Sequence, residues 1–166
     1  MPELVDRFGR KHTYLRISVT DRCNLRCLYC MPEEGMPFMD QDRLLTYPQI
    51  VEIVAAAARL GISKLRITGG EPLVRPNLHE LIGELSAIPG IEEIALTTNG
   101  ILLAPQAKKL KEAGLSRVNI SLDTLDAARF RFIARRGDLS RVIEGIRAAG
   151  EAGLQPIKLN CVLLKG

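Results

Sequence analysis

Three cysteines, Cys23, Cys27 and Cys30, are separated by three and by two residues. This spacing lets three thiolates converge on one iron–sulfur cluster. Such clusters commonly take four ligands, so a site with three local cysteines leaves one iron free to chelate a small molecule. The cysteines are too close together for a useful disulfide framework, and in a reducing compartment such a group more often holds a metal. The spacing therefore predicts a metal or cluster site.

Structural zinc is the main alternative for this cysteine group. A closed zinc site needs four ligands, and the remaining candidates are Cys161 and His12. Cys161 falls on the apolar side of a distant strand-like run, where we expect a core residue. His12 falls on the far side of the first strand-like run. The spacing favours a cluster and leaves zinc open.

Composition and charge limit the classes of function. The chain has 166 residues, of which 46% are hydrophobic and 25% charged, with a net charge of +4. These values are ordinary for one soluble globular domain. The cationic residues are spread along the sequence, so charge does not predict a nucleic-acid partner. No apolar run approaches the roughly 18 residues that cross a membrane, and the first residues lack the apolar stretch of a secretory signal. We therefore expect a cytoplasmic protein with no membrane partner.

Strand-like and helix-like segments alternate along the sequence. Apolar residues at helical spacing lie in residues 50–57, 78–85 and 142–149, and a weaker helix is expected at 126–134. This alternation predicts an α/β fold in which right-handed crossovers join parallel strands. An open doubly wound sheet and part of a β/α barrel are both compatible with it. The expected strands are residues 14–20, 64–68, 93–98, 117–123 and 156–164.

Each expected strand has one apolar face and one partly polar face. Arg16, Arg66, Thr97, Ser121 and Lys158 fall on the polar faces. An antiparallel sheet with one face in water gives the same alternation, but the helical segments between the strands argue against it. We therefore expect an open partial barrel with helices outside and a polar concave face. The cations on that face favour an anionic ligand.

Motifs at the ends of these strands resemble those of the radical S-adenosylmethionine superfamily. The pattern Cys-x3-Cys-x2-Cys, with an aromatic residue at Tyr29, directly follows the first strand and is similar to the superfamily's signature. The second strand runs into TGGEP at 68–72, which is similar to its GGEP element. TTNG at 97–100 and SLD at 121–123 end the third and fourth strands. Ligands of β/α folds bind at the carboxyl ends of strands, where all of these motifs fall.

The resemblance implies a 4Fe–4S cluster on the three clustered cysteines, with S-adenosylmethionine chelated at the free iron. Reduction would then split the sulfonium into methionine and a 5′-deoxyadenosyl radical. By motif position, the resemblance places Tyr29 beside the adenine, Gly70 beside the methionyl end and Ser121 in a hydrogen bond to the cofactor. Tyr29 also suits a rim aromatic, Gly70 a turn and Ser121 an ordinary strand serine, and these interpretations stay open.

Within the superfamily, residues from about 7 to 166 resemble the GTP 3′,8-cyclase family of molybdenum cofactor biosynthesis. The resemblance implies that Arg16, Arg66, Thr97 and Lys158 contact GTP. It also implies a lyase in which the radical abstracts a ribose hydrogen and the 3′ carbon attacks C8 of the purine. A reductase or flavodoxin-type electron donor is expected, and a homodimer is compatible with the sequence. The resemblance lies in the stretches YLRISVTDRCNLRCLYCMPEEG, KLRITGGEPLVR, LTTNGILL, RVNISLDTLD and KLNCVLLKG.

The family also carries a second cluster on three cysteines of a C-terminal region, and this sequence has no second cysteine triplet. We therefore expect residues 1–166 to be a radical SAM core domain, truncated and not competent for the full cyclisation. Another radical enzyme, such as a peptide-modifying maturase, and a non-catalytic metal-binding module remain alternatives. The cations of the polar face favour the cyclase, because a peptide needs no triphosphate cradle. Arg75, Arg135 and Arg136 lie outside the strand faces and are expected to be solvated or in surface ion pairs.

Overall fold

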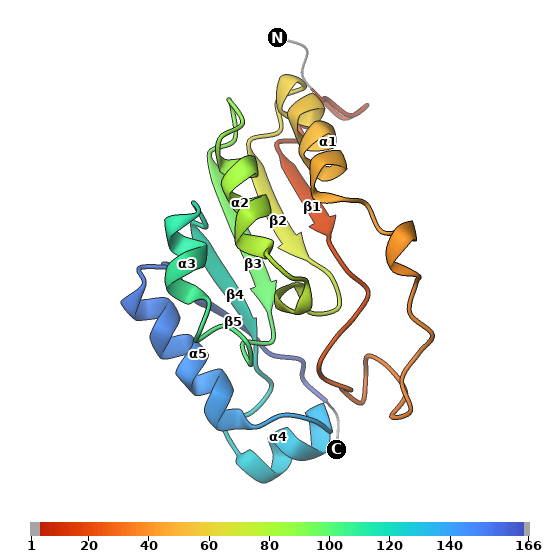
Figure 1. Ribbon diagram of the computed structural model, residues 1–166, viewed down its shortest axis with the longest axis vertical. Helices are drawn as coiled ribbons and strands as arrows, with labels where there is room; N and C mark the ends of the chain where they lie inside the picture. The colour runs from red at the N-terminus through yellow and green to blue at the C-terminus, as the bar shows by residue number, and fades with distance from the viewer. Residues whose placement is uncertain (1–3, 165–166) are drawn as a thin grey trace.

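One parallel five-stranded sheet organises the computed structural model, which describes residues 4–164 (Figure 1). The strands lie side by side in chain order. Sequential parallel order is that of a β/α barrel, whereas a doubly wound sheet reverses its order at a switch point. The sheet is open at both edges within the described residues, so the expected partial barrel is confirmed. The strands are β1 (Tyr14–Ser18), β2 (Lys64–Thr68), β3 (Glu93–Thr98), β4 (Arg117–Ser121) and β5 (Lys158–Asn160).

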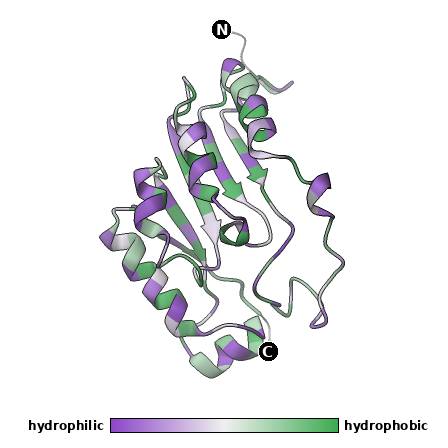
Figure 2. Cartoon of the chain, viewed as in Figure 1, coloured by the Kyte–Doolittle hydropathy of each residue, from purple (hydrophilic) through white to green (hydrophobic). Residues whose placement is uncertain are grey.

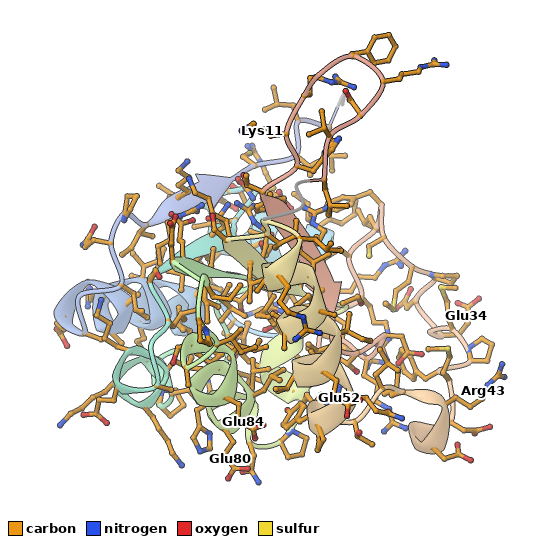
Figure 3. The ribbon with its side chains drawn as sticks, turned by 90° about the horizontal axis from the view of Figure 1, so that it is seen from above. Lys11, Glu34, Arg43, Glu52, Glu80 and Glu84 are labelled. Carbon is orange, nitrogen blue, oxygen red and sulfur yellow. The ribbon has the colours of Figure 1, made fainter. Side chains whose placement is uncertain are left out.

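The helices that connect the strands cover one face of the sheet (Figures 1 and 3). Figure 3 shows Glu52 of α1 and Glu80 and Glu84 of α2 pointing outward from this helical layer. The short helix α4 (Ala127–Ala134) lies instead beyond the carboxyl ends of the strands (Figure 1). The covering helices are α1 (Tyr47–Arg59), α2 (Leu78–Ser86), α3 (Ala107–Glu112) and α5 (Leu139–Glu151), and two short 3₁₀ turns, η1 (Gln41–Arg43) and η2 (Pro72–Val74), lie in the connections.

Local sequence explains where two of these helices begin. At α1 the Thr46 hydroxyl accepts from the Gln49 N–H, and the Gln49 side chain accepts from the Thr46 N–H, which makes a capping box with Pro48 in the first turn. At α4 the Asp126 carboxylate accepts from the Arg129 N–H at 2.7 Å. These bonds satisfy N–H groups that have no partner inside the helix.

The hydrophobic core lies between the sheet and the helical layer. The apolar faces of the three central strands are fully buried there, as the alternation predicts. Apolar and polar segments accordingly alternate along α2 and α5 (Figure 2). Side chains with 0% exposure include Leu65 and Ile67 of β2, Leu96 of β3, Val118 and Ile120 of β4, and Val54, Leu81, Leu85, Leu110 and Val142 of the helices.

The fifth strand differs from its prediction. It was expected at 156–164, but the structure has only Lys158–Asn160, and Cys161 is exposed instead of buried. Leu159 is 55% exposed and Leu163 is 90% exposed. The apolar alternation is present, but β5 is an edge strand and no described helix covers it, so its apolar side chains have no partner surface. The prediction of Cys161 as a core residue is therefore wrong.

The first and fourth strands end two residues earlier than expected, at Ser18 and Ser121, because the chain leaves the sheet there toward the loops described below. No helix within residues 4–164 is both long enough and apolar enough to span a membrane. Residues 1–3 and 165–166, the ends of the expected domain and of its last motif stretch, lie outside the described residues.

Candidate functional site

The loops that follow β1 to β4 meet at the carboxyl edge of the sheet. The Gly70 N–H donates to the Thr20 carbonyl, and the Glu71 N–H donates to the Arg22 carbonyl, each at 2.7 Å. These two bonds attach the loop after β2 to the cysteine-bearing segment, residues 20–32. Since all strands run in parallel, their carboxyl ends share one edge, and the motifs predicted to meet there do so.

Helix α4 holds the same segment from the other side. The Arg26 N–H donates to the Ala134 carbonyl at 3.1 Å, and the Leu28 N–H donates to the Ile133 carbonyl at 3.0 Å. The last carbonyls of a helix have no partner inside it, so the end of α4 offers acceptors to the cysteine-bearing segment. The segment is thus fixed between the sheet edge and α4.

The three cysteines are free thiols in this segment. Cys23 and Cys27 are half-buried and Cys30 is exposed. Burial raises the pKa of the Cys27 thiol to about 11, and it also raises the pKa of Cys23. A bound metal reverses this, because a coordinating thiol is deprotonated outright.

The three thiols are compatible with a cluster, whose protein ligands need not meet at one atom. Within residues 4–164, no three His, Cys, Asp or Glu side chains converge closely enough to hold one metal ion. A structural zinc ion needs four ligands around one atom. In a cluster each cysteine binds a different iron, so the thiolates need only surround it. His12 lies 3.6 Å from Asp6, and the Cys161 sulfur lies 3.4 Å from the Asp123 carbonyl, so both have other neighbours.

Glu71 joins the loop after β2 to the loop after β3. Its side chain is buried, and one carboxylate oxygen, Oε1, accepts from the Leu73 N–H at 3.0 Å and from the Thr98 hydroxyl at 2.7 Å. The other, Oε2, accepts from the Asn99 N–H at 2.7 Å. Burial raises the pKa of Glu71, while these hydrogen bonds act in the opposite direction. The Asn99 side chain then donates to Asn24 at 2.7 Å, which extends the connection to the cysteine-bearing segment.

Gly70 is required by the close approach of that segment. A Cβ at this position would lie 2.4 Å from the Arg22 carbonyl oxygen and 2.6 Å from that of Asp21. At Gly69 a Cβ would lie 2.4 Å from the Thr20 carbonyl oxygen. Sequence reasoning gave Gly70 a cofactor contact or a turn and missed this packing, which no local pattern reveals. The cofactor contact of Gly70 stays a prediction.

Tyr29 and Ser121 line one small cavity together with Cys27, and their expected cofactor contacts stay predictions. The Tyr29 hydroxyl donates to the Asp123 carboxylate at 2.7 Å, which fixes the ring against the end of β4. The cavity is only about 30 Å³, on the scale of a water molecule. Asn99 also lines the cavity, and sequence reasoning did not assign it.

The four residues expected to contact GTP lie on the open face of the sheet. Arg16 of β1 and Arg66 of β2 are register partners, and Thr97 of β3 and Lys158 of β5 both pair with Asn119 of β4. The Arg66 Nε and the Thr97 hydroxyl are buried, with no hydrogen-bond partner among the described residues. Buried polar atoms are rarely left unpaired. These two are donors that an acceptor-rich ligand or water would satisfy.

A further cation on the open face, Arg117, is already neutralised. The Arg117 guanidinium donates to Glu93 at 2.7 Å and to Asn119 at 3.0 Å. Arg16, Arg66 and Lys158, by contrast, form no ion pair with any residue of the described part. These three cations therefore give this face free positive charge, to which the exposed Lys64, two residues before Arg66 on the same face of β2, adds.

Arg75 contradicts its prediction as a solvated charge. Its guanidinium donates to the Val19 carbonyl at 2.7 Å and to the Leu45 carbonyl at 2.6 Å, and it lies 4.4 Å from the centre of the Tyr47 ring. Arg75 thus joins the chain leaving β1 to the chain entering α1. Every residue has a backbone carbonyl, so the sequence does not indicate which carbonyls a side chain will bond, and this role could not be predicted.

Comparison with known proteins agrees with the geometry. A family model described as the Radical SAM superfamily matches residues 17–166. The GTP 3′,8-cyclase of Listeria monocytogenes serovar 1/2a is 57% identical over the whole chain, and that of Petrotoga mobilis is 55% identical over 98% of it. Both matches cover 50% of the relative, so the chain spans about half the length of the curated relatives it matches.

Solved structures with the same fold are more distant in sequence. Streptococcus suis SuiB bound to the precursor peptide SuiA matches 93% of this chain and 34% of its own, with a TM-score of 0.74 and 21% identity. Methylornithine synthase matches 89% of this chain and 44% of its own, with a TM-score of 0.71 and 18% identity. At such identities the likeness concerns the fold.

Replacing Gly70 by Ala should destabilise the protein by about 1–3 kcal/mol, because the backbone must move to relieve the overpacking. The matched control is Gly83→Ala in α2, where no atom lies within 4 Å of the new Cβ. Alanine should stabilise that helix by about 0.5–1 kcal/mol. Urea titrations give the free energy of unfolding of both variants and the parent. A Gly70→Ala variant as stable as the parent would contradict the packing argument.

Replacing Glu71 by Gln should change how stability depends on pH. Because burial raises the pKa of Glu71 above its ordinary 4.5, the folded state binds this proton more tightly than the unfolded chain. The resulting stability is fully present below pH 4.5 and is lost as the pH rises through the folded-state pKa. The parent's free energy of unfolding should therefore fall relative to that of the variant as the pH rises from 4.5 toward neutrality.

Urea titrations at a series of pH values measure this difference. A constant offset of about 1–3 kcal/mol should accompany it, because the Gln amide would face the Asn99 N–H with a donor. The matched control is Glu84→Gln, which removes the same charge from the outer side of α2 (Figure 3). If the difference for Glu71→Gln stays flat with pH, burial does not control this carboxyl.

Proposed function

This chain belongs to the radical SAM superfamily, and from that premise we propose that it is the cluster- and cofactor-binding part of a GTP 3′,8-cyclase. One observation carries the proposal. Three free cysteines lie at the carboxyl edge of a sheet whose open face presents three cations without ion pairs among the described residues. A cluster site beside an anion-binding face suits a radical reaction on a nucleoside triphosphate. The 57% identity to a GTP 3′,8-cyclase supports the same assignment.

In this proposal Cys23, Cys27 and Cys30 hold a 4Fe–4S cluster. When bound and reduced, the cluster supplies the electron that cleaves S-adenosylmethionine into methionine and a 5′-deoxyadenosyl radical. Tyr29, held by its hydrogen bond to Asp123, supports the adenine, and Ser121 donates a hydrogen bond to the cofactor. Gly70 keeps the loop backbone close enough to the cysteine-bearing segment for main-chain contacts to the methionyl end.

Arg16, Arg66 and Lys158 bind the triphosphate on the open face of the sheet. Hydrogen bonds between ionised groups are the strong ones, and guanidinium groups match phosphate oxygens in a fork geometry. The unpartnered Thr97 hydroxyl adds a neutral donor between them. The product is the 3′,8-cyclo-7,8-dihydro derivative of GTP.

The remaining assignments belong to the same proposal. Residues 1–166 form one radical SAM core domain of a cytoplasmic enzyme of molybdenum cofactor biosynthesis. A reductase or flavodoxin-type protein donates the electron, and a second cluster belongs to the full-length enzyme. A peptide-modifying role is less well supported, because three unpaired cations on the sheet face serve no purpose for an uncharged peptide backbone.

Anaerobic loading with iron and sulfide should give one oxygen-sensitive 4Fe–4S cluster per chain. Replacing Cys27 by Ser should abolish it, because a cluster held by two thiolates loses a protein ligand it needs. The matched control is Cys161→Ser, which removes an exposed thiol outside the cysteine-bearing segment and should leave iron content unchanged. Iron analysis and absorption spectra are the measurements. Iron loss in Cys161→Ser, or stoichiometric zinc in the purified protein, would refute the cluster assignment.

Replacing Arg66 by Ala should weaken GTP binding while S-adenosylmethionine binding stays unchanged. Loss of a charge-assisted contact costs about 1.5–3 kcal/mol, or roughly 10- to 150-fold in affinity. The matched control is Arg59→Ala, an exposed arginine at the end of α1, on the helical side of the sheet. Calorimetry with each ligand on the cluster-loaded protein separates the two affinities. Equal losses for both ligands would indicate a general folding defect and not a phosphate contact.

A further inference from the structure

Arg26 is a buried cation inside the cysteine-bearing segment. It is only 8% exposed, and its Nη1 donates to the Cys23 carbonyl at 2.8 Å and to the Leu25 carbonyl at 2.7 Å. The loop that follows covers it: the Phe38 ring centre lies 5.7 Å from the guanidinium carbon, and a Cβ at Gly35 would lie 3.3 Å from Nε. The guanidinium is thus enclosed by the segment whose cysteines bind the cluster.

Within residues 4–164, no acidic side chain forms an ion pair with Arg26. Its Nε is also buried without a hydrogen-bond partner in that part of the chain. Glu34 of the covering loop lies at the outer edge of the molecule (Figure 3). Glu71 is buried nearby, but its two oxygens accept from Leu73, Thr98 and Asn99.

A buried positive charge without an ion pair is stabilised when a negative charge lies near it. Arginine stays protonated in proteins, and removing an ion from water without a partner is costly. The cysteine thiols belong to the same segment as Arg26, and a thiol that coordinates a metal is deprotonated and negative. The Nη1 bond to the Cys23 carbonyl holds the guanidinium beside the backbone of one of these cysteines. Thiolates bound to iron would supply the negative charge that the protein atoms alone do not.

We infer that Arg26 is the counter-charge of the iron–sulfur cluster and sets its reduction potential. The inference rests on the cluster of the proposed function. Reduction adds one negative charge to the cluster, and a nearby buried cation stabilises the reduced form more than the oxidised form. Arg26 should therefore raise the potential, which eases electron entry from the donor. The two carbonyl bonds of Nη1 keep the charge in place.

Arg22 offers a matched control on the same segment. It directly precedes Cys23 in the sequence and carries the same charge, but it is exposed. Water and salt screen an exposed charge much more than a buried one. If the charge acted regardless of burial, replacing either arginine would shift the reduction potential equally. If burial makes the charge effective, replacing Arg26 should shift the potential more than replacing Arg22.

The experiment compares Arg26→Gln, Arg26→Lys and Arg22→Gln with the parent after anaerobic cluster loading. Iron content is measured first, and the midpoint potential is then obtained by redox titration followed by electron paramagnetic resonance. Arg26→Gln should shift the midpoint to a more negative potential, Arg26→Lys should stay near the parent, and Arg22→Gln should shift it less than Arg26→Gln. Loss of the cluster in Arg26→Gln with retention in Arg26→Lys would equally support the inference.

Three results would overturn the role of Arg26. They are an unshifted Arg26→Gln variant, equal shifts for Arg26→Gln and Arg22→Gln, and equal effects of Gln and Lys at position 26 on potential or on iron content. The last would show that the carbonyl contacts matter and the charge does not. The parent's iron content tests the proposed function separately. A parent that takes up no cluster overturns both, whereas a loaded parent with an unshifted Arg26→Gln variant overturns only the inference.

Discussion

The buried carboxylate of Glu71 is the contact on which the site's geometry depends. Loops at the end of a parallel sheet are otherwise surface segments with considerable freedom. Glu71 accepts from Thr98 at the end of β3 and from Asn99 in the loop that follows, and its own N–H donates to Arg22 in the cysteine-bearing segment. The contact with Arg22 requires the chain at Gly70 to pass so close to the segment's backbone that no Cβ fits there. A side chain at this position would push the loop after β2 away from the cysteine-bearing segment.

The fold could be predicted where burial follows from the strand itself. The bounds of β2 and β3 match their predictions, because both strands have neighbours on each side and a helix over one face, so period-two alternation translates directly into burial. After β5 the same alternation predicts that Cys161 and Leu163 are buried, but both are exposed, because no described element covers them. The pattern encodes which side chains share a face. It does not encode whether anything packs on that face.

At the site, too, the sequence predicted which residue types are present but not which partners surround them. Sequence motifs identified the cysteines and the cations, but they could not show that Arg117 is compensated by Glu93 while Arg66 is not. Register does not set that difference, because Arg117 and Arg66 both pair with Ala95 and lie at the same offset from Glu93. It depends on the side-chain contact, since the Glu93 carboxylate bonds to Arg117. Arg26 and Arg75 were also beyond prediction, since both bond to backbone carbonyls, which every residue offers.

A sheet with helices on one face separates the requirements of stability from those of chemistry. The covered face holds the aliphatic core, so Leu96 and Val118 can be fully buried without any contribution from the site. The open face is then free of packing demands and can carry cations whose mutual repulsion would destabilise a closed core. The carboxyl edge joins the two faces, because each strand end supplies one loop to it. A cluster bound at that edge would lie between a buried cation on the protein side and an anion-binding face on the substrate side. In the proposed function, electrons would thus enter near one positive charge, while other positive charges would hold the negative charge of the substrate.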